Sequence, residues 1–189
     1  LKLSPEYTFR IYPKNPNVVN YEISERTFFV YNPELNYLLT DRWFITSIRK
    51  RYLNNTSLSF SARNRYEYLT TGFDPTRSSD GLDLPSNSSY NFTEVEMSYR
   101  SDPRKKFNFD SKIAYGSFYN GTKFSIENEF KWRKQPIFNA SMIVNFDAIE
   151  LPKPYSSKNI WLISPKLDFT FTKTLSWTTF VQYNSQGEN

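Results

Sequence analysis

The chain has 189 residues, a mean hydropathy of −0.65 and a net charge of +5, and it contains neither Cys nor His. The absence of Cys excludes disulfides and thiolate chemistry, and the absence of His removes the commonest general base and metal ligand. Lys and Arg are interleaved with Asp and Glu along the chain, so the charge pattern does not indicate a nucleic-acid-binding surface.

Aromatic residues make up 19% of this otherwise polar chain. A soluble core usually relies on Leu, Ile, Val and Ala. Transmembrane β-barrels combine polar lumen residues with lipid-facing residues and girdles of aromatic residues, which produces this mixture. No run of 18 apolar residues occurs, and this excludes a membrane-spanning helix.

In the first half of the chain, apolar residues recur at every second position over 7–11, 19–23 and 58–68, which is the period of a β-strand, whereas the parity of 37–49 is ambiguous. Strands are expected near residues 5–12, from Val19 to Val30, over 37–49 and over 57–70, with turns at 13–17, 32–34 and 50–56. The alternation is blurred near Glu25 and Arg26, where we expect a β-bulge. The segment 71–89 is rich in Gly, Ser, Asp and Pro and is expected to be a long loop of the kind that often carries function.

The second half continues this pattern. Alternation from Val95 to Tyr99, from Phe107 to Tyr115, over 122–134, from Phe138 to Phe146, from Trp161 to Phe171 and over 174–184 predicts six further strands. Asn120-Gly121 is a strong turn dipeptide. Pro165 lacks an N–H, so we expect it to weaken strand pairing or to mark a bulge.

Residues 122–134 show most clearly that each strand has two different faces. Phe124, Ile126 and Phe130 share one parity, whereas Lys123, Glu127 and Glu129 share the other. The charged face meets bulk water in a soluble sheet and the wet lumen in a membrane barrel. In a barrel, the lipid-facing set is expected to be Phe107, Phe109, Phe124, Ile126, Phe130, Val144, Phe169 and Val181. The matching lumen set is Asp110, Lys112, Lys123, Glu127, Glu129, Lys131 and Asp168.

About ten strands are expected, each near the roughly 9–11 residues that a tilted membrane strand needs. The connections 13–17, 50–56, 102–106, 133–137 and 172–174 are short, whereas 71–89, 116–121 and 148–158 are mostly longer. Short turns at one end and longer loops at the other are typical of outer-membrane barrels. We therefore predict an all-β fold, an antiparallel transmembrane β-barrel with about ten strands here. Because strands 5–12 and 174–184 belong to a fragment of a larger barrel in this interpretation, we expect them not to pair with each other.

From about Tyr99 onward, the chain resembles a family of Bacteroidota outer-membrane proteins with an N-terminal family 9-like carbohydrate-binding domain and a C-terminal β-barrel of unknown function. The resemblance lies in three stretches, Ser101-Asp102-Pro103-Arg104-Lys105-Lys106, Gly116-Ser117-Phe118-Tyr119-Asn120-Gly121-Thr122 and Thr179-Phe180-Val181-Gln182-Tyr183-Asn184. It implies that residues 1–189 are part of one outer-membrane β-barrel domain. It also implies that an N-terminal binding domain, earlier strands and closing strands lie outside this chain. No functional residue is carried over.

The longer loops are expected to form one extracellular rim, because loops on rigid scaffolds often carry function. This rim is the candidate ligand or partner site, comprising Asp74, Arg77, Asp80, Asp83, Tyr90, Phe118, Tyr119 and Tyr155. A loop without a partner is the alternative. The opposite rim carries basic turns, with Arg49, Lys50, Arg51, Arg104, Lys105, Lys106, Arg133 and Lys134.

Other site chemistries are weaker interpretations of the same residues. The pairs Glu94/Glu96 and Glu127/Glu129 have a spacing near that of glycosidase carboxylates, but the flanking cations favour a solvated ladder of ion pairs. Asp74, Asp80 and Asp83 are possible Ca²⁺ ligands, yet their spacing fits no EF-hand loop and solvated acids are favoured. Trp43, Trp132, Trp161 and Trp177 suit either sugar stacking or, by preference, an interfacial girdle.

The sequence thus predicts a non-enzymatic protein of the bacterial outer membrane that needs no cofactor or metal. It acts as a pore or as a membrane anchor or scaffold for a binding domain or protein assembly. Its expected partners are outer-membrane lipid or lipopolysaccharide and other outer-membrane proteins, with no nucleic acid. The alternatives are a soluble secreted β-protein that binds glycans and, ranked last, a hydrolase on a β-scaffold.

Overall fold

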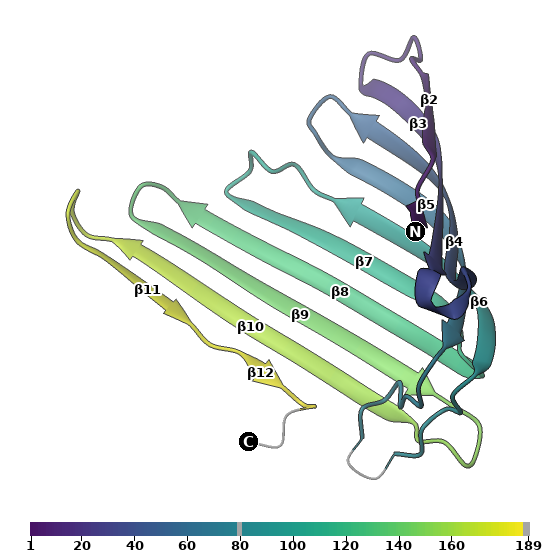
Figure 1. The fold of residues 1–189 in the computed structure, drawn as a ribbon. Helices are drawn as coiled ribbons and strands as arrows, with labels where there is room; N and C mark the ends of the chain where they lie inside the picture. Colours follow the sequence, from purple (N-terminus) through teal and green to yellow (C-terminus); the bar gives the residue numbers. More distant parts are fainter. Residues whose placement is uncertain (79–80, 187–189) are drawn as a thin grey trace.

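The computed structural model describes residues 1–78 and 81–186, and within these ranges the chain forms one antiparallel sheet of twelve strands with one short 3₁₀-helix, η1 (Pro33–Leu35). Neighbouring long strands pair in sequence order (Figure 1). The all-β, antiparallel prediction is therefore confirmed. The strands are β1 (Lys2–Leu3), β2 (Glu6–Ile11), β3 (Val18–Asn32), β4 (Leu38–Tyr52), β5 (Ser57–Leu69), β6 (Ser88–Arg100), β7 (Phe107–Phe118), β8 (Gly121–Lys134), β9 (Phe138–Glu150), β10 (Lys158–Thr170), β11 (Ser176–Phe180) and β12 (Tyr183–Asn184).

Each edge of the sheet carries a strand that is interrupted at a proline. β1 and β2 pair with β3 in a common register, and the break between them includes Pro5. β11 and β12 pair with β10 in a common register, and their break lies opposite Pro165. The Pro165 carbonyl accepts a hydrogen bond from Val181 N–H at 3.1 Å, but Pro165 has no N–H to return. The expected weakening of pairing at Pro165 therefore affects the pairing of β10 with the edge strand formed by β11 and β12.

The sheet is open, because β2 and β11 do not pair with each other. Figure 1 shows them on opposite sides of the molecule, with the strands between them curled. The prediction that the strands near 5–12 and 174–184 are not joined is confirmed. Among the described residues, no helix is long and apolar enough to cross a membrane.

Strand register separates the side chains into two faces. The outer face is mostly apolar, and many of its large side chains are solvent-exposed although they lie in the middle of strands. No second sheet covers it within the described ranges. Its central members, one from each of nine successive strands, are Phe9, Ile23, Ile48, Phe60, Met97, Ile113, Ile126, Val144 and Ile163.

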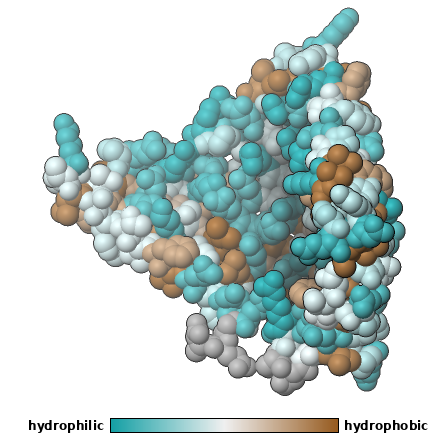
Figure 2. Space-filling model, viewed as in Figure 1, coloured by the Kyte–Doolittle hydropathy of each residue, from teal (hydrophilic) through white to brown (hydrophobic). Residues whose placement is uncertain are grey.

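The inner face carries most of the charged side chains. The residues predicted for the apolar face all lie on the outer face, and the residues predicted for the charged face all lie on the inner face. Each of them is paired with a residue of the same face on a neighbouring strand. Phe107 and Val181 of the apolar set are exposed, and the other six are half-buried. The rings of Phe109 and Phe130, on paired strands, lie 6.3 Å apart between their centroids. Figure 2 shows largely hydrophilic colours in the hollow of the curled sheet.

Two local predictions are wrong, and one position that the sequence left open is assigned. The register shifts of β3 fall at Val18/Asn20 and Val30/Tyr31, near the ends of the strand, and not at Glu25 and Arg26, because pairing with both neighbours continues through this point. The expected loop 116–121 is a two-residue turn, since β7 and β8 pair as far as Phe118 and Gly121. Trp43, which lies in the stretch of ambiguous parity, belongs to the inner face, because it pairs with Phe28 and Arg65 there.

We expect Pro165→Val to join β11 and β12 into one continuous edge strand, because the new N–H can donate to the Val181 carbonyl. One added backbone hydrogen bond is worth about 0.5–1.5 kcal/mol. Hydrogen exchange of amides 177–183 should therefore slow. Leu167→Val, which adds a β-branched residue on the same face of β10, is the control and should leave exchange unchanged. Equal slowing in both variants would contradict the role given to Pro165.

Candidate functional site on the inner face

Ion pairs cover the inner face. Among the described residues, every ion pair except Arg104–Asp102, which lies in the turn after β6, joins inner-face side chains. Several cross from strand to strand, such as Lys112–Glu127 at 2.7 Å and Lys123–Asp147 at 3.2 Å. Opposite charges on paired strands stabilise a sheet, and most of these side chains remain partly solvated. The expectation that the charged residues of this face contact one another is confirmed.

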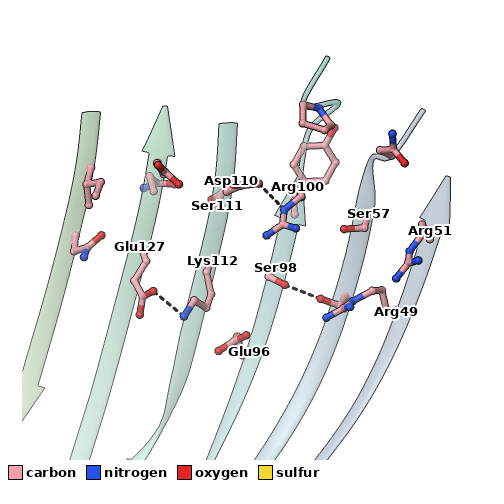
Figure 3. Close-up of a pocket in the computed structure, with 18 residues that line it drawn as sticks. Arg49, Arg51, Ser57, Glu96, Ser98, Arg100, Asp110, Ser111, Lys112 and Glu127 are labelled. Carbon is pink, nitrogen blue, oxygen red and sulfur yellow. Dashed lines mark hydrogen bonds and ion pairs between the residues drawn. The ribbon is translucent and has the colours of Figure 1, made fainter. Parts of the chain in front are cut away.

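A hollow of about 710 Å³ lies on the inner face, toward the end of the sheet with the short turns. Figure 3 shows side chains from neighbouring strands projecting into it. Its volume is within the range of small-molecule sites. Its polar lining includes Arg49, Arg51, Ser57, Ser59, Glu96, Ser98, Arg100, Asp110, Lys112, Glu127, Glu129 and Asn145.

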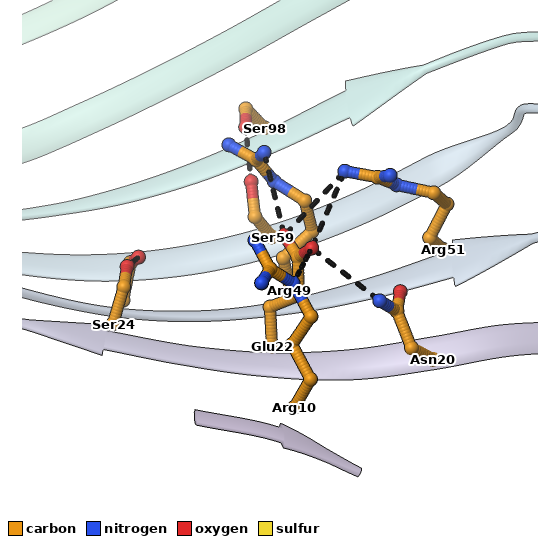
Figure 4. Close-up of polar contacts among 9 residues, drawn as sticks. Arg10, Asn20, Glu22, Ser24, Arg49, Arg51, Ser59 and Ser98 are labelled. Atoms are coloured by element: carbon orange, nitrogen blue, oxygen red, sulfur yellow. Dashed lines mark hydrogen bonds and ion pairs between the residues drawn. The ribbon is translucent and has the colours of Figure 1, made fainter. Parts of the chain in front are cut away.

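Beside this hollow, three guanidinium groups share one carboxylate. Glu22 Oε1 lies 3.0 Å from Arg10 Nε and 3.4 Å from an Arg51 terminal nitrogen, and Glu22 Oε2 lies 3.9 Å from Arg49. Asn20 also donates to Glu22 Oε1 at 3.4 Å (Figure 4). The Glu22 side chain is only 11% exposed, whereas the three arginine side chains are 43–51% exposed. The cluster therefore buries its single negative charge and leaves its positive charges open to solvent.

The opposite ratio of cations to acids occurs mainly on the neighbouring strands β5 and β6, nearer to the long loops. Arg63 lies between Glu94 at 2.7 Å and Glu96 at 3.6 Å. Arg65 lies between Glu67 at 2.8 Å and Asp41 at 3.9 Å. Each of these guanidinium groups serves two carboxylates. The inner face is thus cationic near the short turns of β2–β4 and anionic around Arg63 and Arg65, nearer to the long loops.

The loop between β5 and β6, described at residues 70–78 and 81–87, packs against the inner face at the end with the long loops. Leu84 and Thr76 are completely buried, and nearby Leu69 and Phe92 are also buried. The backbone of Phe73 exchanges hydrogen bonds with Leu84. The Gln186 side chain, which follows β12, donates to the Thr76 carbonyl at 3.4 Å. The loop therefore reaches from the end of β5 to the far edge of the sheet along the inside of its curl.

Tyr119 is the centre of the aromatic packing that holds this loop. Its ring lies 4.8 Å from Phe118, 5.3 Å from Tyr90 and 5.9 Å from Phe73, between ring centroids. Its hydroxyl donates to Glu67 at 3.1 Å. Burial, together with the neighbouring Glu67 carboxylate, raises the pKa of Tyr119 well above its usual value. The phenol therefore stays protonated and remains a donor.

Asp74 organises the turn at the start of the loop. Its carboxylate accepts hydrogen bonds from the backbone N–H groups of Thr76 and Ser78, both at 2.8 Å, and from the Thr76 hydroxyl. Burial opposes ionisation of Asp74, but these hydrogen bonds outweigh it and lower the pKa of the carboxyl below its usual value.

The structure brings together only part of the predicted rim. Tyr90, Phe118 and Tyr119 form one aromatic cluster that contacts the loop through Phe73. Arg77 and Asp83 are exposed, and Asp80 lies outside the described residues. Tyr155 lies in the separate loop 151–157, where its N–H donates to the Pro152 carbonyl at 3.1 Å.

The paired carboxylates on the inner face lie beside cations. Glu94 and Glu96 share Arg63, Glu127 contacts Lys112 at 2.7 Å, and Glu129 contacts Lys131 at 2.7 Å. These contacts form the ladder of ion pairs that the flanking cations favoured in the sequence. Within residues 1–78 and 81–186, no three acidic side chains converge into a group that could hold a metal ion.

Sequence reasoning missed the Glu22 cluster. Its cations come from two strands, Arg10 from β2 and Arg49 and Arg51 from β4, and only the pairing of both strands with β3 aligns them with Glu22. Leu84 was likewise not predicted as buried, since it lies in a polar segment without periodicity.

Comparison of the chain with protein-family models, curated proteins and solved structures finds no match.

We expect Leu84→Ala to release the loop 70–87 from the inner face. Truncating a buried Leu costs about 2–5 kcal/mol, so trypsin cleavage after Arg77 should accelerate by roughly tenfold or more. The control is Leu82→Ala, because Leu82 is 51% exposed. Cleavage at the same rate in both variants would show that Leu84 does not hold the loop.

Asp74→Asn is expected to weaken the same loop in a pH-dependent manner. Because the pKa of Asp74 is lowered by folding, its stabilising contribution is complete above the usual Asp pKa and is lost as the pH falls through the lowered value. Hydrogen exchange at Thr76 and Ser78 should therefore differ between the variant and the parent protein at neutral pH and converge in acid. Asp83→Asn, at an exposed carboxylate, serves as the control. A difference that persists unchanged in acid would contradict this role of the Asp74 charge.

Proposed function

We propose that this chain forms part of the wall of a transmembrane antiparallel β-barrel in a bacterial outer membrane. It acts there as a pore or as an anchor or scaffold for a binding domain or protein assembly. The supporting observation is the pairing of an exposed, mostly apolar outer face with an inner face covered by ion pairs. Soluble monomers rarely expose apolar patches larger than a few hundred Å², whereas lipid covers such a surface at no cost in hydration.

Strand length supports this proposal. β3 to β10 contain 12–15 residues each. A 13-residue strand extends for roughly 43 Å, and a tilt of about 40° leaves roughly 33 Å along the membrane normal, close to the ~30 Å hydrocarbon core.

Aromatic residues collect at both margins of the outer face, which is the arrangement of interfacial girdles. Near the short turns the set is Tyr21, Tyr52, Tyr99, Phe107, Trp132, Phe138, Phe169 and Trp177, and toward the long loops it is Tyr66, Tyr115, Phe124, Phe146, Trp161 and Tyr183. Between them, Ile48, Phe60, Val95, Met97 and Ile113 line an apolar hollow of about 520 Å³ that suits an acyl chain.

Charges within the outer face are few and have nearby partners. Lys50 lies 4.7 Å from the ring centre of Tyr52, and Arg42 lies 5.1 Å from that of Phe44. Glu25 accepts a 2.8 Å hydrogen bond from the Tyr7 hydroxyl, beside the sheet edge. Long basic side chains at the margins can extend toward headgroups.

In this proposal, the open edges at β2 and β11 pair with further strands, because a barrel leaves no lipid-exposed edge. Lipid or lipopolysaccharide then contacts the outer face. The exposed rim residues Arg77 and Asp83 are the side chains best placed to contact other outer-membrane proteins. The resemblance to the Bacteroidota barrel family agrees with this location.

The four tryptophans provide a direct test, since three lie on the outer face and Trp43 lies on the inner face. Single-Trp proteins, with the other three replaced by Phe, are reconstituted in vesicles of brominated or unmodified phosphatidylcholine. Bromine should quench Trp132, Trp161 and Trp177, whereas Trp43, which packs against Arg65 at 4.6 Å, should keep its fluorescence. Equal fluorescence of all four proteins in both lipids would reject the membrane proposal in favour of a soluble β-protein.

A further inference from the structure

We infer that the cluster of Arg10, Arg49 and Arg51 around Glu22 is a binding site for a small anionic solute that carries a phosphate or carboxylate group. The inference concerns the inner face and does not require that the outer face contact lipid. It therefore stands or falls separately from the proposed membrane location.

Charge balance distinguishes this cluster from the rest of the face. Three guanidinium groups meet one carboxylate, which leaves two positive charges in excess. Elsewhere the described ion pairs match one cation to one acid, as in Lys112–Glu127 and Lys123–Asp147, or place one cation between two acids, as at Arg63 and Arg65. Asp110 also contacts two cations, Arg100 and Lys131, but Lys131 contacts Glu129 as well, so that group has two cations and two acids. Like charges held together disfavour one another, so a bound anion would relieve their repulsion.

The geometry leaves donors available to such an anion. Arg10 uses its Nε and Arg51 a terminal nitrogen toward Glu22, while Arg49 approaches it only at 3.9 Å. Each guanidinium has five N–H donors in a planar fork that matches carboxylate and phosphate oxygens. All three side chains are about half-exposed. The anchoring carboxylate, by contrast, is nearly buried, so it holds the arginines in place without closing the site.

The hollow next to the cluster provides room for the rest of the solute. Arg49 and Arg51 line it directly, and hydroxyl groups follow on the adjacent strands (Figure 3). Ser59 and Ser98 lie 2.6 Å apart between their Oγ atoms, so one hydroxyl donates to the other (Figure 4). Hydroxyl groups beside guanidinium groups can orient an oxyanion or the sugar-like part of a solute. A lipid headgroup is a poorer occupant, because the cluster lies on the face opposite the exposed apolar side chains.

The test uses the purified protein in a non-ionic detergent, with inorganic phosphate as the probe and sodium chloride at equal ionic strength as the reference. Phosphate should raise the melting temperature relative to chloride, because a ligand that binds only the folded state stabilises it. The variant Arg49→Gln/Arg51→Gln should bind phosphate roughly tenfold or more weakly, because it loses two guanidinium groups that can make charge-assisted hydrogen bonds to the anion. Arg63→Gln removes one positive charge from the same face and should keep the response.

Glu22→Gln separates binding from a purely structural role. The Gln amide oxygen can still accept hydrogen bonds from Arg10 and Arg51 and so keep them in place, but it no longer competes as an anion. Phosphate binding should therefore strengthen, even if the variant melts at a lower temperature. An arm with phosphatidylglycerol in the micelles tests the lipid source. The inference is overturned if Arg49→Gln/Arg51→Gln responds like the parent protein, if Glu22→Gln loses the response, or if only the anionic lipid stabilises the protein.

Discussion

The antiparallel hydrogen-bond ladder from β2 to β11 determines the face of every side chain in the sheet. Each long strand pairs with its sequence neighbours, and shifts of register occur only near the ends of β3. A shift of one residue would exchange the apolar and charged faces. Continuous pairing therefore keeps the rows of Ile and Phe residues together on one face and aligns the cations with the carboxylates on the other.

A single layer of this kind has no conventional core. Few apolar side chains of the described residues are buried, and several of these, such as Leu69, Leu84 and Ile149, lie toward the long-loop end. In water, the apolar side chains of the outer face would stay exposed, so the sheet would lack much of the favourable free energy of apolar burial that normally offsets the loss of chain entropy on folding. This is the physical reason for placing that face against lipid. It also explains the importance of the loop 70–87, which supplies apolar packing that the sheet itself does not provide.

The inner face is not uniform. The ratio of cations to acids changes across the face, from three arginines around Glu22 near the short turns to single arginines between two acids nearer to the long loops. If the outer face spans a membrane, a solute moving along the inner face passes regions of opposite sign. An arrangement of this kind favours anions at the short-turn end and opposes them near the loops.

The sequence determined the strand content, the two-faced character of residues such as Phe124 and Lys123, and the weak pairing at Pro165, because these depend on local periodicity and on the chemistry of single residues. It also identified Tyr90, Phe118 and Tyr119 as neighbours of the long loop. It did not show that Glu22 lies beside Arg10, Arg49 and Arg51, or that Trp43 faces inward. Only the tertiary structure decided these features. The contacts of Glu22 and the face of Trp43 depend on strand register, and the burial of Leu84 depends on the path of a loop without periodicity. Short-range sequence patterns encode neither the register nor the path.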